Sequence, residues 1–232
     1  MRLITMNIRH GGGDRVPRII SFLAALSPDT VVLTEYRANE KGVFISENLR
    51  AQGYGWQAAS SVEPKQNCVY IASKHPFAVV ASGADAEIDS HRVLVAQFKS
   101  FDIVGVYFPQ NEAKRPVFTH LRTNLLPRIG VAGVVIGDFN TGKPFEDEAG
   151  KTFSCSDCFS ELLASGLIDS WRIRNSEARE FTWFSHAGNG FRVDHALCTK
   201  AFDSRIQSVA YLHKCREDGT TDHSAMLVEH DA

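Results

Sequence analysis

Polar side chains that border or interrupt short apolar runs are the residues of this sequence most able to do chemistry. Apolar runs of this kind are typical of strands buried on both faces of a sheet, and ligands of α/β sheets bind beyond the carboxyl ends of such strands. Five runs carry such residues, namely Asn7, Glu35, Asp138 with Asn140, Asp194, and Asp222 with His223. One acid beside a strand is more often a helix cap or a turn residue, so the prediction depends on the five positions occurring together.

The residue types at these positions suit a hard metal ion. Carboxylates gathered at one edge of a sheet repel one another unless a cation or a histidinium lies between them. Oxygen ligands from Asp, Glu and Asn, without thiolates, favour Mg²⁺, with Mn²⁺ as an alternative. We therefore expect a divalent metal site in which these side chains take part.

The elements that must position these residues alternate between strand and helix patterns. Apolar residues recur at helical spacing over Ile19–Leu26, Val43–Arg50, 116–128 and Phe159–Ser165. Strands are predicted at Arg2–Asn7, Thr30–Leu33, Val69–Ser73, Arg92–Lys99, Phe101–Phe108, Val134–Gly137, Phe181–Phe184, Phe191–Thr199, Ile206–Leu212 and Ala225–Val228. With no internal repeat and no linker, residues 1–232 are expected to form one α/β domain with two sheets flanked by helices.

Composition excludes several classes of protein. Hydrophobic residues make up 44% of the 232 residues and charged residues 22%, which excludes a disordered chain. No apolar run approaches the ~18 residues of a membrane span, and the first residues lack the pattern of a secretory signal. Five cysteines, an odd number, suit a reducing compartment better than a disulfide framework, so we expect a cytoplasmic protein. The net charge of −2 excludes a uniformly basic surface but leaves room for a local basic groove.

Charge is distributed unevenly along the chain. Residues 91–128 carry six basic side chains against two acidic ones, and residues 138–166 carry six acidic side chains against two basic ones. This pattern has two interpretations, which both remain open. The basic segment could face phosphates beside an acidic segment that faces a metal, or both could be ordinary solvated surface.

Seven short segments, in order along the chain, point to a known group of enzymes. They are Thr5–Asn7, Val32–Glu35, Tyr107–Asn111, Gly137–Asn140, Phe181–Trp183, Arg192–His195 and Asp222–Ser224. In this combination the chain resembles the endonuclease/exonuclease/phosphatase superfamily, the deoxyribonuclease-I-like metal-dependent phosphoesterases. Leu163–Arg172 followed by Phe181–Phe184 is most similar to its exonuclease III and abasic-site endonuclease branch.

Three features depart from that branch. Thr34 precedes Glu35 where the family usually has Gln. Arg9 stands where the abasic-site branch commonly has a second Asn or Asp, which bears on a second metal position. The loop Ser185–Gly190 is short beside the branch's DNA-contacting insertion.

The resemblance implies a four-layer α/β sandwich, with two mixed β-sheets packed face to face and helices on the outside. It also implies roles for individual residues. Asn7, Glu35 and Asp222 would hold Mg²⁺, while Tyr107, Asp138, Asn140, Asp194 and His223 would carry out catalysis, and Arg92, Asn140 and His223 would bind the substrate phosphate. Asp194 would hold the His223 tautomer, and the general base remains open among Asp138, Asp194 and His223.

Three functions fit this sequence. A metal-dependent DNA nuclease of the exonuclease III type, with abasic-site cleavage as one form of it, is favoured by the Trp171 and Trp183 segments and by the basic segment 91–128. A phosphoesterase for a small-molecule or lipid phosphoester is favoured by the acidic balance and the short loops. A catalytically silent binding module is disfavoured, because every expected polar position is occupied. We expect a monomer that binds DNA and needs no obligate protein partner.

Overall fold

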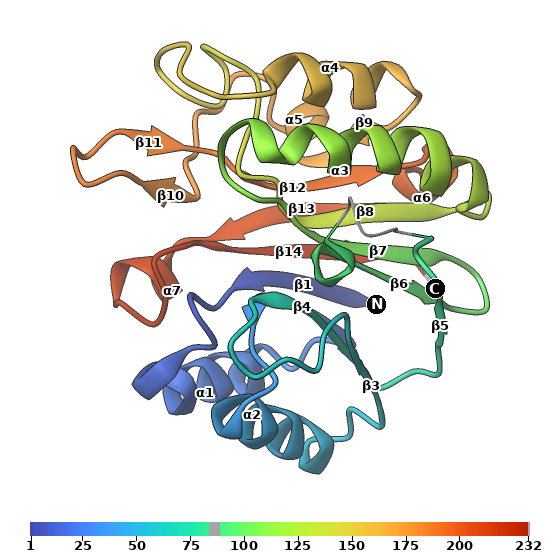
Figure 1. The fold of residues 1–232 in the computed structure, drawn as a ribbon, viewed down its shortest axis with the longest axis vertical. Helices are drawn as coiled ribbons and strands as arrows, with labels where there is room; N and C mark the ends of the chain where they lie inside the picture. The colour runs from blue at the N-terminus through green and yellow to red at the C-terminus, as the bar shows by residue number, and fades with distance from the viewer. Residues whose placement is uncertain (84–88, 232) are drawn as a thin grey trace.

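Two six-stranded mixed sheets lie face to face in the computed structural model, which describes residues 1–83 and 89–231 (Figure 1). The first sheet has the order β13 (Ile206–Leu212), β14 (Ala225–His230), β1 (Arg2–Asn7), β2 (Thr30–Tyr36), β4 (Cys68–Ser73), β3 (Trp56–Ala59). The second has the order β5 (Ala78–Val80), β6 (Val93–Gln97), β7 (Asp102–Tyr107), β8 (Gly133–Asp138), β12 (Asp194–Cys198), β9 (Ile168–Asp169). A separate hairpin joins β10 (Trp183–Phe184) to β11 (Gly190–Phe191).

Helices cover the outer face of each sheet, which confirms the predicted four layers. The helices α1 (Val16–Leu26) and α2 (Glu40–Ala51) lie outside the first sheet, and α3 (Arg115–His120), α4 (Ser156–Ala164) and α5 (Ser170–Arg174) lie outside the second (Figure 1). Two short helices, α6 (Lys200–Asp203) and α7 (Lys214–Glu217), follow β12 and β13. The amphipathic pattern that predicted α1 is borne out, since its apolar side packs on the sheet.

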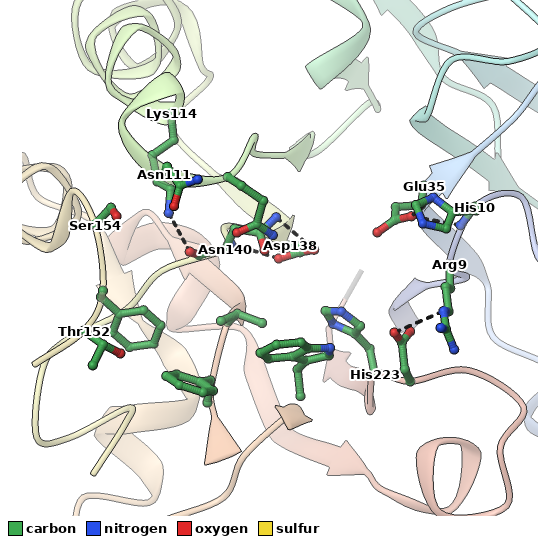
Figure 2. Close-up of a pocket in the computed structure, with 16 residues that line it drawn as sticks. Arg9, His10, Glu35, Asn111, Lys114, Asp138, Asn140, Thr152, Ser154 and His223 are labelled. Atoms are coloured by element: carbon green, nitrogen blue, oxygen red, sulfur yellow. Dashed lines mark hydrogen bonds and ion pairs between the residues drawn. The ribbon is translucent and has the colours of Figure 1, made fainter. Parts of the chain in front are cut away.

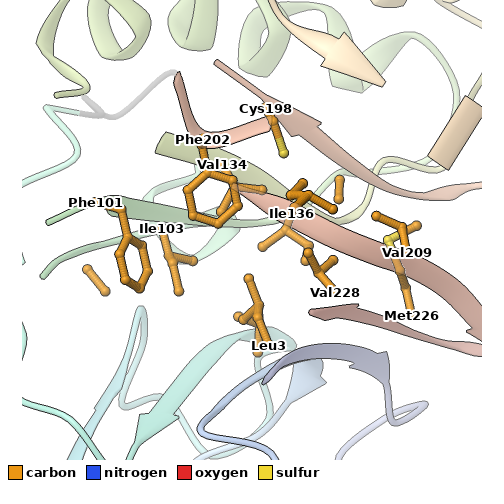
Figure 3. Packing of buried hydrophobic residues seen from close by; sticks show 14 of the residues in the cluster. Leu3, Phe101, Ile103, Val134, Ile136, Cys198, Phe202, Val209, Met226 and Val228 are labelled. Carbon is orange, nitrogen blue, oxygen red and sulfur yellow. The ribbon is translucent and has the colours of Figure 1, made fainter. Parts of the chain in front are cut away.

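The core between the sheets is built from the inward faces of both. Leu3 and Val228 of the first sheet meet Ile103 and Ile136 of the second in one buried cluster (Figure 3). The sheets approach closely at Gly105, where an added Cβ would lie 2.7 Å from a Val69 methyl group. This central layer gives the strand ends a rigid base.

Strand register brings the predicted polar residues to one edge. β1 and β2 are parallel, as are β7 and β8, so their carboxyl ends fall at the same side of each sheet. β12 runs antiparallel to β8 and places Asp194 directly opposite Asp138. Residues far apart in sequence therefore meet where the two sheets end.

Several elements differ from the sequence prediction. The predicted strand Phe191–Thr199 is wrong as one strand, because Arg192 and Val193 separate β11 from β12. The Arg192 amide donates to the Asp147 carbonyl instead of a neighbouring strand (2.8 Å), so the ladder is interrupted there. The helix predicted over 116–128 becomes α3, a π-helical turn Leu121–Leu125 and a 3₁₀ turn Leu126–Arg128. β3, β5 and β9 lie outside the strands that the sequence predicts.

Among the described residues, no helix is both long enough and apolar enough to cross a membrane. The cytoplasmic location and the monomeric state remain predictions from the sequence.

Candidate active site

A pocket of about 330 Å³ lies at the edge where the strand ends meet (Figure 2). Its lining includes five of the residues predicted from the sequence, namely Glu35, Asp138, Asn140, Asp222 and His223. Asn7 is buried behind them, and its amide donates to Asp138 (2.9 Å) and Glu35 (3.1 Å). The structure thus brings the predicted metal ligand Asn7 next to both carboxylates.

His223 and Asp194 form a buried pair. The Nδ1 atom of His223 lies 2.9 Å from Oδ2 of Asp194, and both residues are less than a tenth exposed. Burial alone would lower the pKa of His223, but the negative charge and hydrogen bond of Asp194 raise it to about 10. The imidazole is therefore charged at neutral pH, and its Nε2 proton is available for donation. The two side chains that the resemblance paired are therefore in contact.

Asp138 ends β8 in a fully buried position. Its carboxylate accepts from the Asn7 amide and from the Asn140 backbone (2.9 Å). Burial and the negative charge of Asp194 together raise the pKa of Asp138 to about 7, although His223 partly opposes them. A carboxyl group with such a pKa can exchange a proton near neutral pH.

Strained backbone surrounds the pocket. Glu35, at a bulge of β2, and Asn140 adopt φ values of 56° and 51°, in the left-handed region that costs most residues energy. Arg9, His10 and Asn111 share this conformation and also line the pocket. Such strain persists where tertiary contacts require it, and at Asn140 it directs the amide towards the Phe108 carbonyl (2.8 Å) and Asp138.

The donor set at one side of the pocket suits a hard divalent cation. Glu35 accepts through Oε2 from the His10 backbone (2.8 Å) and from Asn67 (2.9 Å), which fixes the carboxylate at the pocket wall. Glu35, Asp138 and Asp222 place three carboxylates around one space. Ligand atoms of Asp138, Asp194 and His223 also lie within 4.8 Å of one another. Since His223 Nδ1 is engaged by Asp194, we regard those two as a proton-handling pair.

Asp222 is held differently from the other two predicted metal ligands. Its carboxylate forms an ion pair with Arg9, with Nε and Oδ2 3.4 Å apart. Arg9 stands where the abasic-site branch commonly has a second Asn or Asp. A guanidinium already supplies positive charge at that place.

Tyr107 and Arg92 lie next to each other, and neither is among the described residues that line the pocket. The Arg92 guanidinium lies over the Tyr107 ring, 4.9 Å from its centroid, and also pairs with Asp89 (3.5 Å). Burial and the negative charge of Glu35 raise the pKa of Tyr107 to about 12, so the phenol keeps its proton. Tyr107 stands opposite Asp138 in the β7–β8 ladder.

An aromatic wall completes the pocket, and most of it was missed from the sequence. Trp183, Phe191 and Phe153 share the lining, with ring centroids 5.7 Å apart for Trp183 and Phe191 and 5.5 Å for Phe153 and Phe191. Trp183 belongs to the segment Phe181–Trp183 that carries the family resemblance, and it is partly exposed and lines the pocket. Phe153 and Phe191 lie in a loop and a two-residue strand, where periodicity carries no signal.

The basic segment does not form a free phosphate-binding strip. Arg115 pairs with Asp157 (2.8 Å) and Glu112 (3.0 Å), and Arg122 pairs with Glu161 (2.8 Å). The acidic segment therefore neutralises part of the basic one where α4 contacts α3 and the π-helical turn that follows it.

Arg192 of the Arg-x-Asp motif lies in the interior and binds acids there. It is 1% exposed and contacts Asp147 (2.7 Å) and Asp169 (2.6 Å), while its guanidinium lies 5.0 Å from the Trp171 ring centroid. Burial alone would raise the pKa of both carboxyls, but the charge of Arg192 holds them below the usual range. Arg192 thereby anchors the chain immediately before Asp194.

No protein-family model matches the sequence, and no curated protein does. Solved structures match over their whole length and over the whole of this chain. An AP endonuclease from Archaeoglobus fulgidus is 20% identical with a TM-score of 0.85. The 3′ phosphatase NExo from Neisseria, in a variant form bound to a product DNA hairpin, is 23% identical with a TM-score of 0.83. The 3′-5′ exonuclease NExo from Neisseria meningitidis is 23% identical with a TM-score of 0.82. The chain therefore has the fold of the deoxyribonuclease-I-like enzymes that its motifs resemble.

Proposed function

We propose that this protein is a divalent-metal-dependent hydrolase of phosphodiester bonds in DNA. The observation that carries the proposal is the contact of His223 with the buried Asp194, because His223 lines one pocket with Glu35, Asp138 and Asn140. The names of the similar structures, an AP endonuclease, a 3′ phosphatase and a 3′-5′ exonuclease, support a phosphoester bond of DNA as the target.

The residues divide the chemistry among them. Glu35 and Asn7, with Asp222 as a further candidate, would hold Mg²⁺, which when bound supplies positive charge and Lewis acidity at a phosphate oxygen. His223 donates its Nε2 proton to another phosphate oxygen, because Asp194 keeps the imidazole charged. Asn140 orients the phosphate.

Of the three candidates for general base, Asp138 fits best. An efficient base has a pKa near the working pH, and Asp138 has a pKa of about 7 while His223 keeps its proton. Asp194 is engaged in holding His223. We therefore assign removal of the proton from the attacking water to the Asp138 carboxylate.

The aromatic wall favours a nucleotide chain over a minimal diester. Trp183, Phe191 and Phe153 offer apolar surface on which a deoxyribose or base can pack. The alternative is a small-molecule or lipid phosphoester, and the pairing of Arg115 and Arg122 with acids favours it, because it leaves few cations for a long DNA backbone.

Purified protein with Mg²⁺ would be assayed on plasmid DNA, a duplex with one abasic site, a duplex ending in a 3′ phosphate, and bis-p-nitrophenyl phosphate. We expect cleavage or dephosphorylation of at least one DNA substrate at a far higher kcat/KM than for the small diester. Hydrolysis of the small diester with no activity on any DNA would contradict the proposed DNA hydrolase and favour the small-molecule or lipid phosphoesterase.

A further inference from the structure

Lys114 is a buried lysine at the end of the pocket opposite Glu35. It closes the 3₁₀ turn Asn111–Lys114 and is 2% exposed, yet it belongs to the pocket lining. Its ammonium donates to the Asn140 carbonyl (2.7 Å). Within residues 1–83 and 89–231, no carboxylate lies within ion-pair distance of this ammonium.

A buried ammonium without an ion-pair partner is costly, and the negative charges of Asp138 and Glu112 offset only part of its desolvation. Burial accordingly lowers the pKa of Lys114. Glu112, two residues before Lys114, is held by the neighbouring Arg115 (3.0 Å). The carbonyl of Asn140 uses one of three N–H groups, which leaves donors for an anion from outside the protein.

Two further donors line the same pocket beside Lys114. Asn111 holds its side chain there with a left-handed backbone, φ 55°, and Ser154 contributes a hydroxyl from the loop before α4. In Figure 2 these three residues lie on the side away from Glu35, His10 and Arg9, with Asn140 and Asp138 between the two groups. The pocket thus has a carboxylate end that suits a cation and a Lys114 end that suits an anion.

We propose that Lys114, Asn111 and Ser154 form a second phosphate subsite, which takes a phosphate neighbouring the one that is hydrolysed in a polynucleotide strand. The subsite rests on the proposed function and deepens it, because an enzyme with two phosphate subsites prefers substrates that carry successive phosphates. The aromatic wall lines the same pocket and offers a surface for the sugar or base that joins two phosphates.

The test compares one substrate with many phosphates and one with a single phosphate. Steady-state kcat/KM is measured for a labelled oligonucleotide duplex and for bis-p-nitrophenyl phosphate, with wild type, Lys114→Met and the adjacent control Arg115→Met. If Lys114 acts only by supporting Asn140, its loss weakens both reactions equally. The readout is therefore kcat/KM for the duplex divided by kcat/KM for the small diester. We expect the ratio to fall by about tenfold or more in Lys114→Met, the scale of a hydrogen bond to a charged group, and to stay within about twofold in Arg115→Met, whose side chain is bound to Asp157.

Binding gives a second readout. In Ca²⁺, the slope of log affinity for the duplex against log salt should become shallower by about 0.9 in Lys114→Met, the loss of one phosphate contact. Equal losses on both substrates with an unchanged salt slope would overturn the subsite and leave Lys114 as a support for Asn140. Unchanged kinetics in Lys114→Met would overturn it too.

Circular dichroism checks that Lys114→Met folds. If it does not, Asn111→Ala undergoes the same comparison, with an expected fall of the ratio by about threefold for a neutral hydrogen bond, and an unchanged ratio overturns the subsite. A wild type that hydrolyses neither substrate would instead refute the proposed function, and the subsite with it.

Discussion

His223 depends on Asp194 for its charge and its orientation in the pocket. Asp194→Ala and His223→Ala should each lower kcat by at least about 10²-fold, the usual scale for a proton donor. Because the two act as one unit, the double variant should lose far less than the product of the single losses. Single-turnover kinetics of the four proteins measure this, and strictly multiplicative losses would show that the pair seen at 2.9 Å does not operate as a unit.

Glu35 should decide metal affinity with little effect on folding. Glu35→Gln keeps the size of the side chain but removes its charge, so the Kd for Mn²⁺ should rise by at least about tenfold. Substitution of a residue that only hydrogen-bonds to a metal ligand already weakens metal binding by this factor. Titration calorimetry gives the Kd, and thermal unfolding should show a similar Tm. Glu161→Gln, at the exposed Arg122 pair, serves as the control; equal Mn²⁺ affinity in wild type and Glu35→Gln would remove Glu35 from the metal site.

At the scale of elements, residues at strand ends could be predicted because they contrast with the apolar runs before them. Val134–Ile136 cannot be mistaken for a loop, and Asp138 and Asn140 follow at once. Parallel pairing of the central strands then brings such residues to one edge whatever the strand order. The Asp194–His223 contact came from the family resemblance, since periodicity alone does not order strands.

Features that depend on contacts between residues distant in sequence, or on very short exposed strands, could not be predicted. The break at Arg192 and Val193 exists because Arg192 turns inward to Asp147 and Asp169, residues distant in sequence. β5 is three residues long and largely exposed, so it lacks the alternation that marks a half-buried strand. The ion pairs of Arg115 and Arg122 depend on where α4 packs, which charge counting does not show.

The Arg192 network should make the β11–β12 junction sensitive to substitution. Arg192→Met leaves the buried Asp169 without its guanidinium partner and leaves Asp147 with Arg172 alone (2.8 Å), and we expect a loss of about 3–5 kcal/mol in the free energy of unfolding. Urea denaturation at pH 7 measures it. Arg174→Met, which removes the partly exposed pair with Asp203, should cost clearly less; a loss in Arg192→Met no larger than this would contradict the role of the network.

The same network predicts how stability depends on pH. The pKa values of Asp147 and Asp169 are lower in the folded protein than in the unfolded chain. Their contribution to the free energy of unfolding is therefore complete above the pKa of the unfolded chain, about 4. It is lost as the pH falls towards the lower pKa values of the folded protein. Unfolding free energy should decline below about pH 4 more steeply in wild type than in Arg192→Met, and parallel pH profiles would contradict this.

At the scale of the whole molecule, the ion pairs that Arg115 and Arg122 form with acids of α4 should limit the electrostatic attraction of the protein to DNA. Neutralising Arg115 and Arg122 together should change the salt slope of duplex binding by less than one phosphate contact, about 0.9, because both side chains are already paired. Fluorescence anisotropy in Ca²⁺ at several salt concentrations measures the slope. A decrease in the slope equal to about two phosphate contacts would contradict this and would favour the interpretation in which the basic segment faces phosphates.

Dependence on a divalent cation tests the central claim most directly. Metal-stripped protein, with its metal content verified, would be mixed with a labelled abasic-site duplex and with a 3′-phosphate duplex in excess chelator, and Mg²⁺ would then be titrated back. The arrangement of Glu35, Asn7 and the His223–Asp194 pair predicts no turnover in chelator and full recovery with Mg²⁺. An undiminished rate of DNA hydrolysis in the metal-free protein would contradict it.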